Sequence, residues 1–212
     1  PLDAEGEVAD DARIVAALPT IALIQEGGGR VILASHLGRP KGKVDAKYSL
    51  EPVARRLAEL LGQDVLLPDD CIGNAAEHLV ANQRTSQIVL LENLRFHAGE
   101  TANGDEFARR LSELCDVYVS DAFGAMHREH ASVSALPKIV PDRAAGLLVE
   151  REIAFLSKLI NGAESPYVAI LGGAKISDKI EVIEKLLGVI NGLIIGGAMA
   201  NTFLAAQGHA VG

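Results

Sequence analysis

Histidine and arginine side chains follow three separate apolar runs in this 212-residue sequence. Guanidinium groups form paired hydrogen bonds that match the oxygens of a carboxylate or a phosphate. In an open sheet of parallel strands, the loops after the strands share one edge, which is where ligands bind. The pattern therefore predicts a basic pocket for a small anion. The residues of the three loops are His36 and Arg39, then Arg95 and His97, then His127, Arg128 and His130.

The first of these loops shows the pattern most clearly. Residues 31–34 form a short apolar run without alternation, which is typical of a strand buried on both faces. The polar stretch S-H-L-G-R-P follows at once. Gly38 permits a tight turn, and Pro40 prevents the strand from continuing. A cation and an imidazole on such a turn suit a small anionic ligand.

The segments that must position these loops alternate between strand and helix patterns. Apolar residues at helical spacing predict helices, and continuous β-branched runs predict buried strands. Such alternation is typical of parallel sheets built from crossover connections. We therefore predict an α/β fold with a doubly wound, Rossmann-like parallel sheet in three α/β/α layers. The expected strands are 31–34, 64–67, 87–92 and 117–120, the expected helices are 12 to the glycines at 27–29, 50–61, 73–81, 105–114 and 146–159, and 137–143 is expected to be a loop.

Two turns near the carboxyl end are rich in glycine. Residues 168–171 and 193–195 are expected strands, and each is followed by G-G-A and a helix. Glycines at a helix start let backbone amides approach a phosphate, and Lys175 and Lys179 lie one helical turn apart. Paired glycines also serve helix–strand packing, so spacing alone leaves the two interpretations evenly balanced. Neither G-x-G-x-x-G nor G-x-x-x-x-G-K-[ST] is present.

Composition narrows the classes of function. The chain has 20 basic and 28 acidic residues and a net charge of −8, which disfavours non-specific binding to nucleic acid. Cys71 and Cys115 lack metal-ligand spacing and are expected to be small buried residues in a reducing compartment. No apolar stretch approaches the roughly 18 residues of a membrane span, and no signal peptide opens the chain. We expect a soluble cytoplasmic protein without membrane or nucleic-acid partners.

Each arginine taken alone is more often a surface salt-bridge partner than a ligand-binding residue. Three basic loops on one sheet edge favour ligand binding over a surface salt-bridge role. The position of Arg13 also indicates an anion site. A cation near the start of a helix is unfavourable with respect to the helix dipole, and a nearby anion would offset this effect.

Four motifs, in their order and at their distances, resemble the phosphoglycerate kinase family. They are S-H-L-G-R-P, L-E-N-L-R-F-H, D-A-F-G-A-M-H-R-E-H-A-S and I-L-G-G-A-K-I-S-D-K-I. The resemblance, which runs over the whole chain, implies two doubly wound α/β domains. The amino-terminal domain would bind 3-phosphoglycerate or 1,3-bisphosphoglycerate, and the carboxy-terminal domain would bind ATP or ADP with Mg²⁺. It also implies a monomeric glycolytic kinase, a phosphotransferase with a carboxyl group as acceptor.

The resemblance also assigns roles to residues. It implies that Arg13 stabilises the transferring phosphoryl group, that Lys175 follows this group between substrates, and that Lys179 is catalytic with them. The implied substrate-binding residues are Arg13, His36, Leu37, Gly38, Arg39, Arg95 and Arg128. The implied nucleotide-binding residues are Gly172, Gly173, Ala174, Lys175, Lys179, Gly196 and Gly197. No metal ligand is expected in this chain, because the magnesium-linked residues belong to a later part of the family sequence.

The resemblance predicts a chain that is partial at both ends. The family begins with a strand ending in V-D-F-N just before the segment that matches Pro1, and its later W-N-G-P-x-G and G-G-G-D-T motifs are absent here. We expect 1–145 to be a substrate-binding domain without its first strand, 146–163 a hinge helix, and 164–212 the start of a nucleotide-binding domain. Weak or absent turnover is expected, with loose packing or aggregation around 166–212.

Two other functions stay open. A non-catalytic anion-binding domain would keep the arginine pocket alone. An unrelated Rossmann-type oxidoreductase is disfavoured by the missing G-x-G-x-x-G.

Overall fold

The computed structural model describes residues 1–173 and 176–211. The chain divides into two compact units, residues 1–151 and 152–212. Each unit is built around its own parallel strands. In the described part of the chain, no helix has the length and apolar character needed to cross a bilayer.

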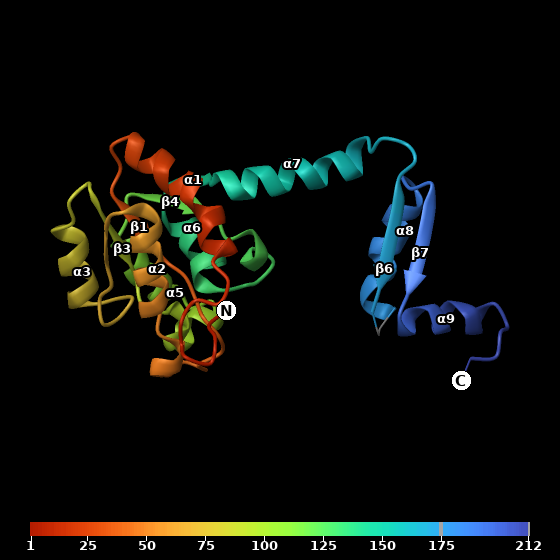
Figure 1. Ribbon diagram of the computed structural model, residues 1–212, viewed down its shortest axis with the longest axis horizontal. Coiled ribbons are helices and arrows are strands. Elements are labelled where there is room, and N and C mark those ends of the chain that lie inside the picture. The colour runs from red at the N-terminus through yellow and green to blue at the C-terminus, as the bar shows by residue number, and fades with distance from the viewer. Residues whose placement is uncertain (174–175, 212) are drawn as a thin grey trace. The chain divides into compact units, whose positions relative to one another are not determined.

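The strands of the first unit pair in parallel (Figure 1). β3 lies between β1 and β2, and β4 pairs with β5 in a second sheet. In register, Val31 lies opposite Ile88, and Val117 lies opposite Asp142. The strands are β1 (Val31–Leu33), β2 (Asp64–Leu66), β3 (Gln87–Leu90), β4 (Val117–Ser120) and β5 (Asp142–Ala145).

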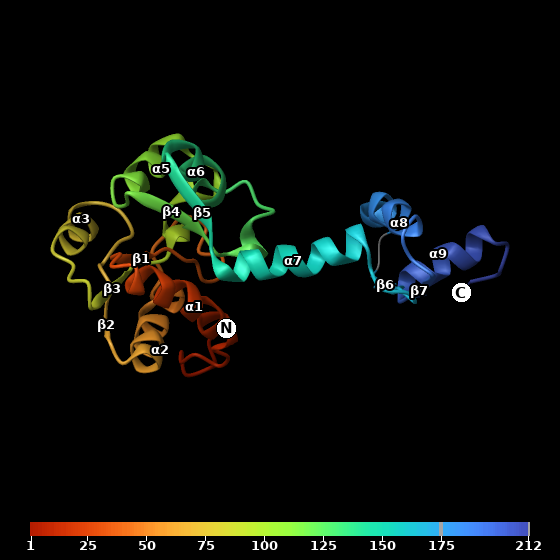
Figure 2. The same ribbon diagram turned by 90° about the horizontal axis from the view of Figure 1, so that it is seen from above.

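Helices lie on both sides of these strands, with α1 and α2 on one side and α5 and α6 on the other (Figure 2). The predicted α/β fold class, with parallel strands alternating with helices, is confirmed. The helices of the first unit are α1 (Ala12–Glu26), α2 (Glu51–Leu61), α3 (Asn74–Ala81), α4 (Ala98–Thr101), α5 (Asp105–Ser112), α6 (Leu136–Ile139) and α7 (Leu147–Asn161), which continues into the second unit.

The core of the first unit explains this layering. Ile88 of β3 packs with Ile21 of α1 and Leu57 of α2. The next residue, Val89, packs in a different cluster that contains Phe107 of α5. Successive side chains of a strand point to opposite faces of its sheet. β3 is therefore buried on both faces, and both Ile88 and Val89 have 0% exposure.

The second unit has two parallel strands, β6 (Val168–Gly172) and β7 (Gly192–Gly196). α8 (Ile180–Leu187) lies between them in sequence, and α9 (Ala198–Ala206) follows β7 (Figure 1). Ile170 of β6 is 74% exposed and Ile194 of β7 is 54% exposed, so this small sheet presents apolar side chains to solvent.

One local prediction is wrong. Residues 137–143, expected to be a loop, contain most of α6 and the start of β5, and a π-helical turn, Ala131–Ala135, comes just before them. The four residues of β5 are exposed and none is β-branched, so the sequence carries no strand pattern there. Pairing with β4 organises this segment.

Candidate anion-binding site

Asn93 joins the loop after β3 to the loop after β1. Its side chain has 0% exposure, and Nδ2 donates hydrogen bonds of 2.8 Å to the carbonyl oxygens of Leu37 and Tyr48. Its Oδ1 accepts the backbone N–H of Arg95 at 3.0 Å. A buried amide is stable only when its polar atoms are bonded. The asparagine of L-E-N-L-R-F-H therefore fixes the conformation of S-H-L-G-R-P.

Glu92 anchors the same loop to the start of α2. Its Oε1 accepts the backbone N–H groups of Leu50 and Asn93 at 2.8 and 2.7 Å, and its Oε2 accepts the Ser49 hydroxyl at 2.7 Å. A carboxylate at a helix start bonds free N–H groups and interacts favourably with the helix dipole. The end of β3 is thus held rigidly in front of α2.

Gly38 has a positive φ of +62°, a conformation that favours glycine. A Cβ on Gly38 would overlap the ring of Tyr48. The Gly38 carbonyl accepts a 2.8 Å hydrogen bond from Nη1 of Arg95. The glycine therefore lets the backbone pass close to Tyr48 and turn its carbonyl toward Arg95.

Arg95 is a buried cation with incomplete bonding. Its residue exposure is 7%, and apart from the bond to Gly38, its Nε and Nη2 have no hydrogen-bond partner among the described residues. Burial lowers the pKa of Arg95, as do the positive charges of Arg128 and Arg39, while the carboxylate of Glu100 opposes them. Unpaired buried donors cost free energy, and an anion accepts hydrogen bonds from them.

The pKa of His36 shows which other cations face the same space. It is lowered from 6.5 to about 4, first by burial and then by the positive charges of Arg95, Arg128, His130 and Arg13. The structure therefore brings together charges from the start of α1 and from the loops after β1, β3 and β4. His36 is neutral at pH 7. We call Arg13, His36, Arg39, Arg95 and Arg128 the arginine cluster.

A buried carboxylate, which no sequence pattern indicated, supports this cluster. Glu100 is 1% exposed and accepts hydrogen bonds from Ser132, from its N–H at 3.0 Å and from its hydroxyl at 2.7 Å. Its Oε1 lies 3.5 Å from Nδ1 of His130. Burial lowers the pKa of His130, and Glu100 acts in the opposite direction. Glu100 thus holds the segment that follows Arg128.

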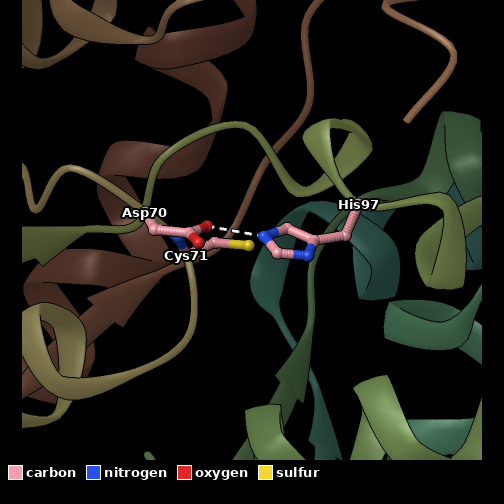
Figure 3. A group of neighbouring side chains, drawn as sticks. All are labelled: Asp70, Cys71 and His97. Carbon is pink, nitrogen blue, oxygen red and sulfur yellow. Dashed lines mark hydrogen bonds and ion pairs between the residues drawn. The ribbon is translucent and has the colours of Figure 1, made fainter. Parts of the chain in front are cut away.

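His97, predicted in one of the basic loops, turns instead toward Asp70 (Figure 3). Its Nε2 lies 2.6 Å from Oδ1 of Asp70, which also accepts the backbone N–H of Cys71 at 2.6 Å. Potential metal-ligand atoms of these three residues lie within 4.8 Å of one another. However, Asp70 and His97 already bond each other, and burial raises the pKa of the Cys71 thiol. We infer that Asp70, Cys71 and His97 have a structural role, in which the bond between Asp70 and His97 holds their two loops together.

The glycine turns of the second unit lie side by side. Gly172 is opposite Gly196, and the Gly173 carbonyl accepts the N–H of Met199 at 3.0 Å. A Cβ on Gly173 would lie 2.7 Å from Nζ of Lys179, and a Cβ on Gly197 would lie 3.3 Å from the Gly173 oxygen. A lysine beside crowded glycine backbone fits a phosphate group. The predicted residues Ala174 and Lys175 lie outside the described residues.

The family model for phosphoglycerate kinase matches residues 1–212. The chain belongs to the phosphoglycerate kinase family. The resemblance inferred from the four motifs is therefore confirmed.

Curated relatives in this family include the phosphoglycerate kinases of Anaeromyxobacter sp. (strain Fw109-5), 55% identical over 100% of this chain, and Bdellovibrio bacteriovorus, 49% identical over 98%. The solved phosphoglycerate kinase of Coxiella burnetii matches with a TM-score of 0.84 and 40% identity, covering 100% of this chain and 53% of that one. The matched part makes up 54% and 52% of the two curated relatives, so the chain spans about half their length.

Proposed function

We propose that this chain supplies the phosphoglycerate-binding part, and the opening of the nucleotide-binding part, of a glycolytic phosphoglycerate kinase. Such a kinase transfers a phosphoryl group reversibly between 1,3-bisphosphoglycerate and ADP, giving 3-phosphoglycerate and ATP. The observation that carries the proposal is Arg95, a buried guanidinium with two nitrogens unpaired within the described residues, amid the charges of the arginine cluster. Family membership supports the same assignment.

In this proposal the arginine cluster binds the carboxylate and phosphate groups of phosphoglycerate. Guanidinium forks match both groups geometrically. Leu37 and Gly38 line the turn between His36 and Arg39, and the Asn93 bond to Leu37 keeps that turn in place. His36 contributes a neutral imidazole, since its pKa of about 4 leaves it uncharged near pH 7. Arg13 stabilises charge on the transferring group, because positioned cations supply most of the catalysis in phosphoryl transfer.

The glycine turns of the second unit are the proposed nucleotide-binding residues. Gly172, Gly173, Gly196 and Gly197 would admit the phosphates of ATP or ADP, and Lys179 would offset their charge. The sequence neighbours Ala174 and Lys175, which lie outside the described residues, are proposed to take part as well, Ala174 through its backbone N–H and Lys175 through its charge. When bound, the nucleotide supplies or accepts the phosphoryl group. Its Mg²⁺ would be held by residues in the remainder of a longer polypeptide. The proposed divisions are 1–145 for substrate, 146–163 for a hinge and 164–212 for the nucleotide.

Titration calorimetry with 3-phosphoglycerate tests the proposal. Arg39→Ala should weaken binding by about 10- to 100-fold, as expected for a lost charge-assisted contact. Arg109→Ala is the matched control, because Arg109 is also exposed but lies on α5. Its affinity should stay within twofold of the parent chain. Absence of saturable binding in the parent chain, or equal losses in both variants, would contradict the proposal.

A coupled assay that measures turnover of ATP and 3-phosphoglycerate distinguishes catalysis from binding alone. We expect binding without robust turnover, because the chain spans about half the length of its relatives. Robust turnover would contradict the proposal that the remaining half is needed.

We also propose that the protein is monomeric and cytoplasmic and has no membrane partner. We propose no nucleic-acid partner either, in keeping with the net charge of −8.

A further inference from the structure

The dipeptide Asn-Gly occurs three times in this chain, at 103–104, 161–162 and 191–192. Asparagine before glycine is prone to spontaneous deamidation, in which the backbone nitrogen of the glycine attacks the side-chain carbonyl carbon of the asparagine. Glycine favours this reaction because it has no side chain to hinder the approach and leaves the backbone free to rotate. Hydrogen bonds and packing oppose the reaction, so the surroundings of the three pairs decide which one reacts.

The pair at 103–104 is held in the turn between α4 and α5. The Gly104 N–H donates a 2.9 Å hydrogen bond to the Gly99 carbonyl, and a Cβ on Gly104 would lie 3.4 Å from the Gly99 backbone. Asn103 is half-buried, and its Nδ2 donates a hydrogen bond of 3.4 Å to the Ser134 hydroxyl. Both reacting groups of this pair are therefore restrained.

Asn191 is exposed, but its side chain and the backbone that follows are hydrogen-bonded. Its Oδ1 accepts the Ser165 hydroxyl at 2.8 Å and the Tyr167 N–H at 2.7 Å. The Gly192 N–H donates to the Tyr167 carbonyl at 3.4 Å, and Gly192 begins β7 opposite Val168 of β6. Attack would require the end of this ladder to open, so this pair is restrained as well.

Asn161, the last residue of α7, lacks such restraints. It is exposed, as is Gly162, and its side chain has no hydrogen bond or ion pair within the part of the chain that the structure describes. The Gly162 N–H has no partner there outside the last turn of α7, and helix ends fray. Gly162 has a φ of +154°, and no described atom lies within 4 Å of a Cβ at this position. The 161–162 pair therefore has room to adopt the geometry of attack.

We propose that Asn161 is a modification site, which converts spontaneously to aspartate and isoaspartate. The Gly162 nitrogen forms a bond to Cγ of Asn161 and loses its proton, and the side-chain nitrogen leaves as ammonia. Water then opens the resulting five-membered imide. Addition of water at Cγ gives aspartate, and addition at the backbone carbonyl carbon gives isoaspartate, in which the main chain runs through Cγ. Water is the only co-reactant, and the reaction does not depend on the binding of phosphoglycerate.

The modification alters the segment that leads from α7 to β6 (Figure 1). Both products carry a negative charge at the carboxyl end of α7, where an anion interacts unfavourably with the helix dipole. Isoaspartate also adds a carbon atom to the main chain. α7 begins in the first unit, and β6 lies in the second. Deamidation therefore changes the charge of the connection between the two units, and isoaspartate also changes its length.

Incubation of the full chain in a mildly alkaline buffer, followed by peptide mapping with mass spectrometry at several times, measures the reaction at each pair. We expect Asn161 to deamidate at least about tenfold faster than Asn103 and Asn191, because the other two pairs react only after local opening. In concentrated urea, which removes these restraints, the three rates should become similar. A rate at Asn161 that is no faster than the rate at Asn103 or Asn191 in the folded chain would overturn the proposal.

Asn161→Gln and Asn191→Gln form the matched pair of variants, because both asparagines are exposed and lie in the second unit. Glutamine keeps the amide but would have to form a six-membered ring, which is much slower. Isoaspartate is measured by the transfer of labelled methyl groups from S-adenosylmethionine, catalysed by an isoaspartyl methyltransferase. Asn161→Gln should remove most of the isoaspartate that forms in the folded chain, and Asn191→Gln should leave it unchanged. An undiminished signal in Asn161→Gln would show that another residue is modified and would overturn the proposal.

Discussion

The side-chain amide of Asn93 donates a 2.8 Å hydrogen bond to the backbone carbonyl of Leu37, across 56 residues of sequence. This bond joins the two loops that carry Arg39 and Arg95. Because Asn93 also bonds Tyr48 and the N–H of Arg95, one buried side chain sets the position of most of the arginine cluster.

Asn93→Ala should therefore damage both stability and ligand binding. It removes the partner of two part-buried carbonyls and of the buried Arg95 N–H, and a buried group without a partner costs about 1–3 kcal/mol. We expect the free energy of unfolding in urea to fall by at least about 2 kcal/mol, and 3-phosphoglycerate affinity to fall at least tenfold. Asn82→Ala is the control, because the Asn82 amide bonds the His78 carbonyl at an exposed helix end. A loss no larger than that of Asn82→Ala would show that Asn93 does not organise the site.

Arg95→Met should separate stability from binding. The guanidinium is buried, lies near other positive charges and is only partly hydrogen-bonded. Methionine therefore removes the free-energy cost of burying this charge and its unpaired donors in the chain without ligand. We expect a small rise in the free energy of unfolding without ligand, about 1 kcal/mol. Affinity for 3-phosphoglycerate should fall at least tenfold. Destabilisation together with unchanged affinity would indicate that Arg95 is a structural residue.

Gly38→Ala tests whether the turn between His36 and Arg39 requires glycine. The positive φ and the overlap with Tyr48 both oppose a methyl group, and strained backbone of this kind costs about 1–3 kcal/mol. Thermal unfolding should show a lower midpoint, and phosphoglycerate binding should weaken because the Gly38 carbonyl bonds Arg95. Gly124→Ala provides the comparison, since no atom lies within 4 Å of a Cβ there among the described residues. Similar midpoints for the two variants would rule out strain at Gly38.

The second unit should be the less protected part of the chain. Its exposed apolar residues include Ile170 and Ile194, while few of its described side chains are buried. Hydrogen exchange followed by mass spectrometry should show faster exchange in β6 and β7 than in β3, because open segments with little buried apolar surface exchange first. Equal protection of β3 and β6 would contradict the expected loose packing.

The sequence predicted the elements of this fold well where side-chain patterns are strong. β3 was recognisable because the apolar run 88–91 has no alternation, as expected for a strand buried on both faces. The basic loops were recognisable because three of them follow strands that were expected to end at one edge of the sheet. β5 was not, because Asp-Arg-Ala-Ala has no strand pattern and depends on pairing with β4. Glu100 was missed for a similar reason. A lone glutamate in a polar stretch carries no signal until Ser132 and His130 come beside it.

Stability should depend on pH through His36. Its pKa is near 6.5 in the unfolded chain and about 4 in the folded chain, so between these values the unfolded chain binds more protons. The free energy of unfolding should therefore be constant above pH 6.5 and fall as the pH drops toward 4, with a limiting slope of about 1.4 kcal/mol per pH unit for one proton. Urea titrations at several pH values measure this slope. His36→Gln should reduce this slope, and the part that remains should come from His130, whose pKa is also lowered by burial. His209→Gln, at an exposed position, should leave the slope unchanged. Sulfate, which does not titrate in this range, should reduce the slope by neutralising the neighbouring arginines. An unchanged slope in His36→Gln would show that other groups cause the pH dependence.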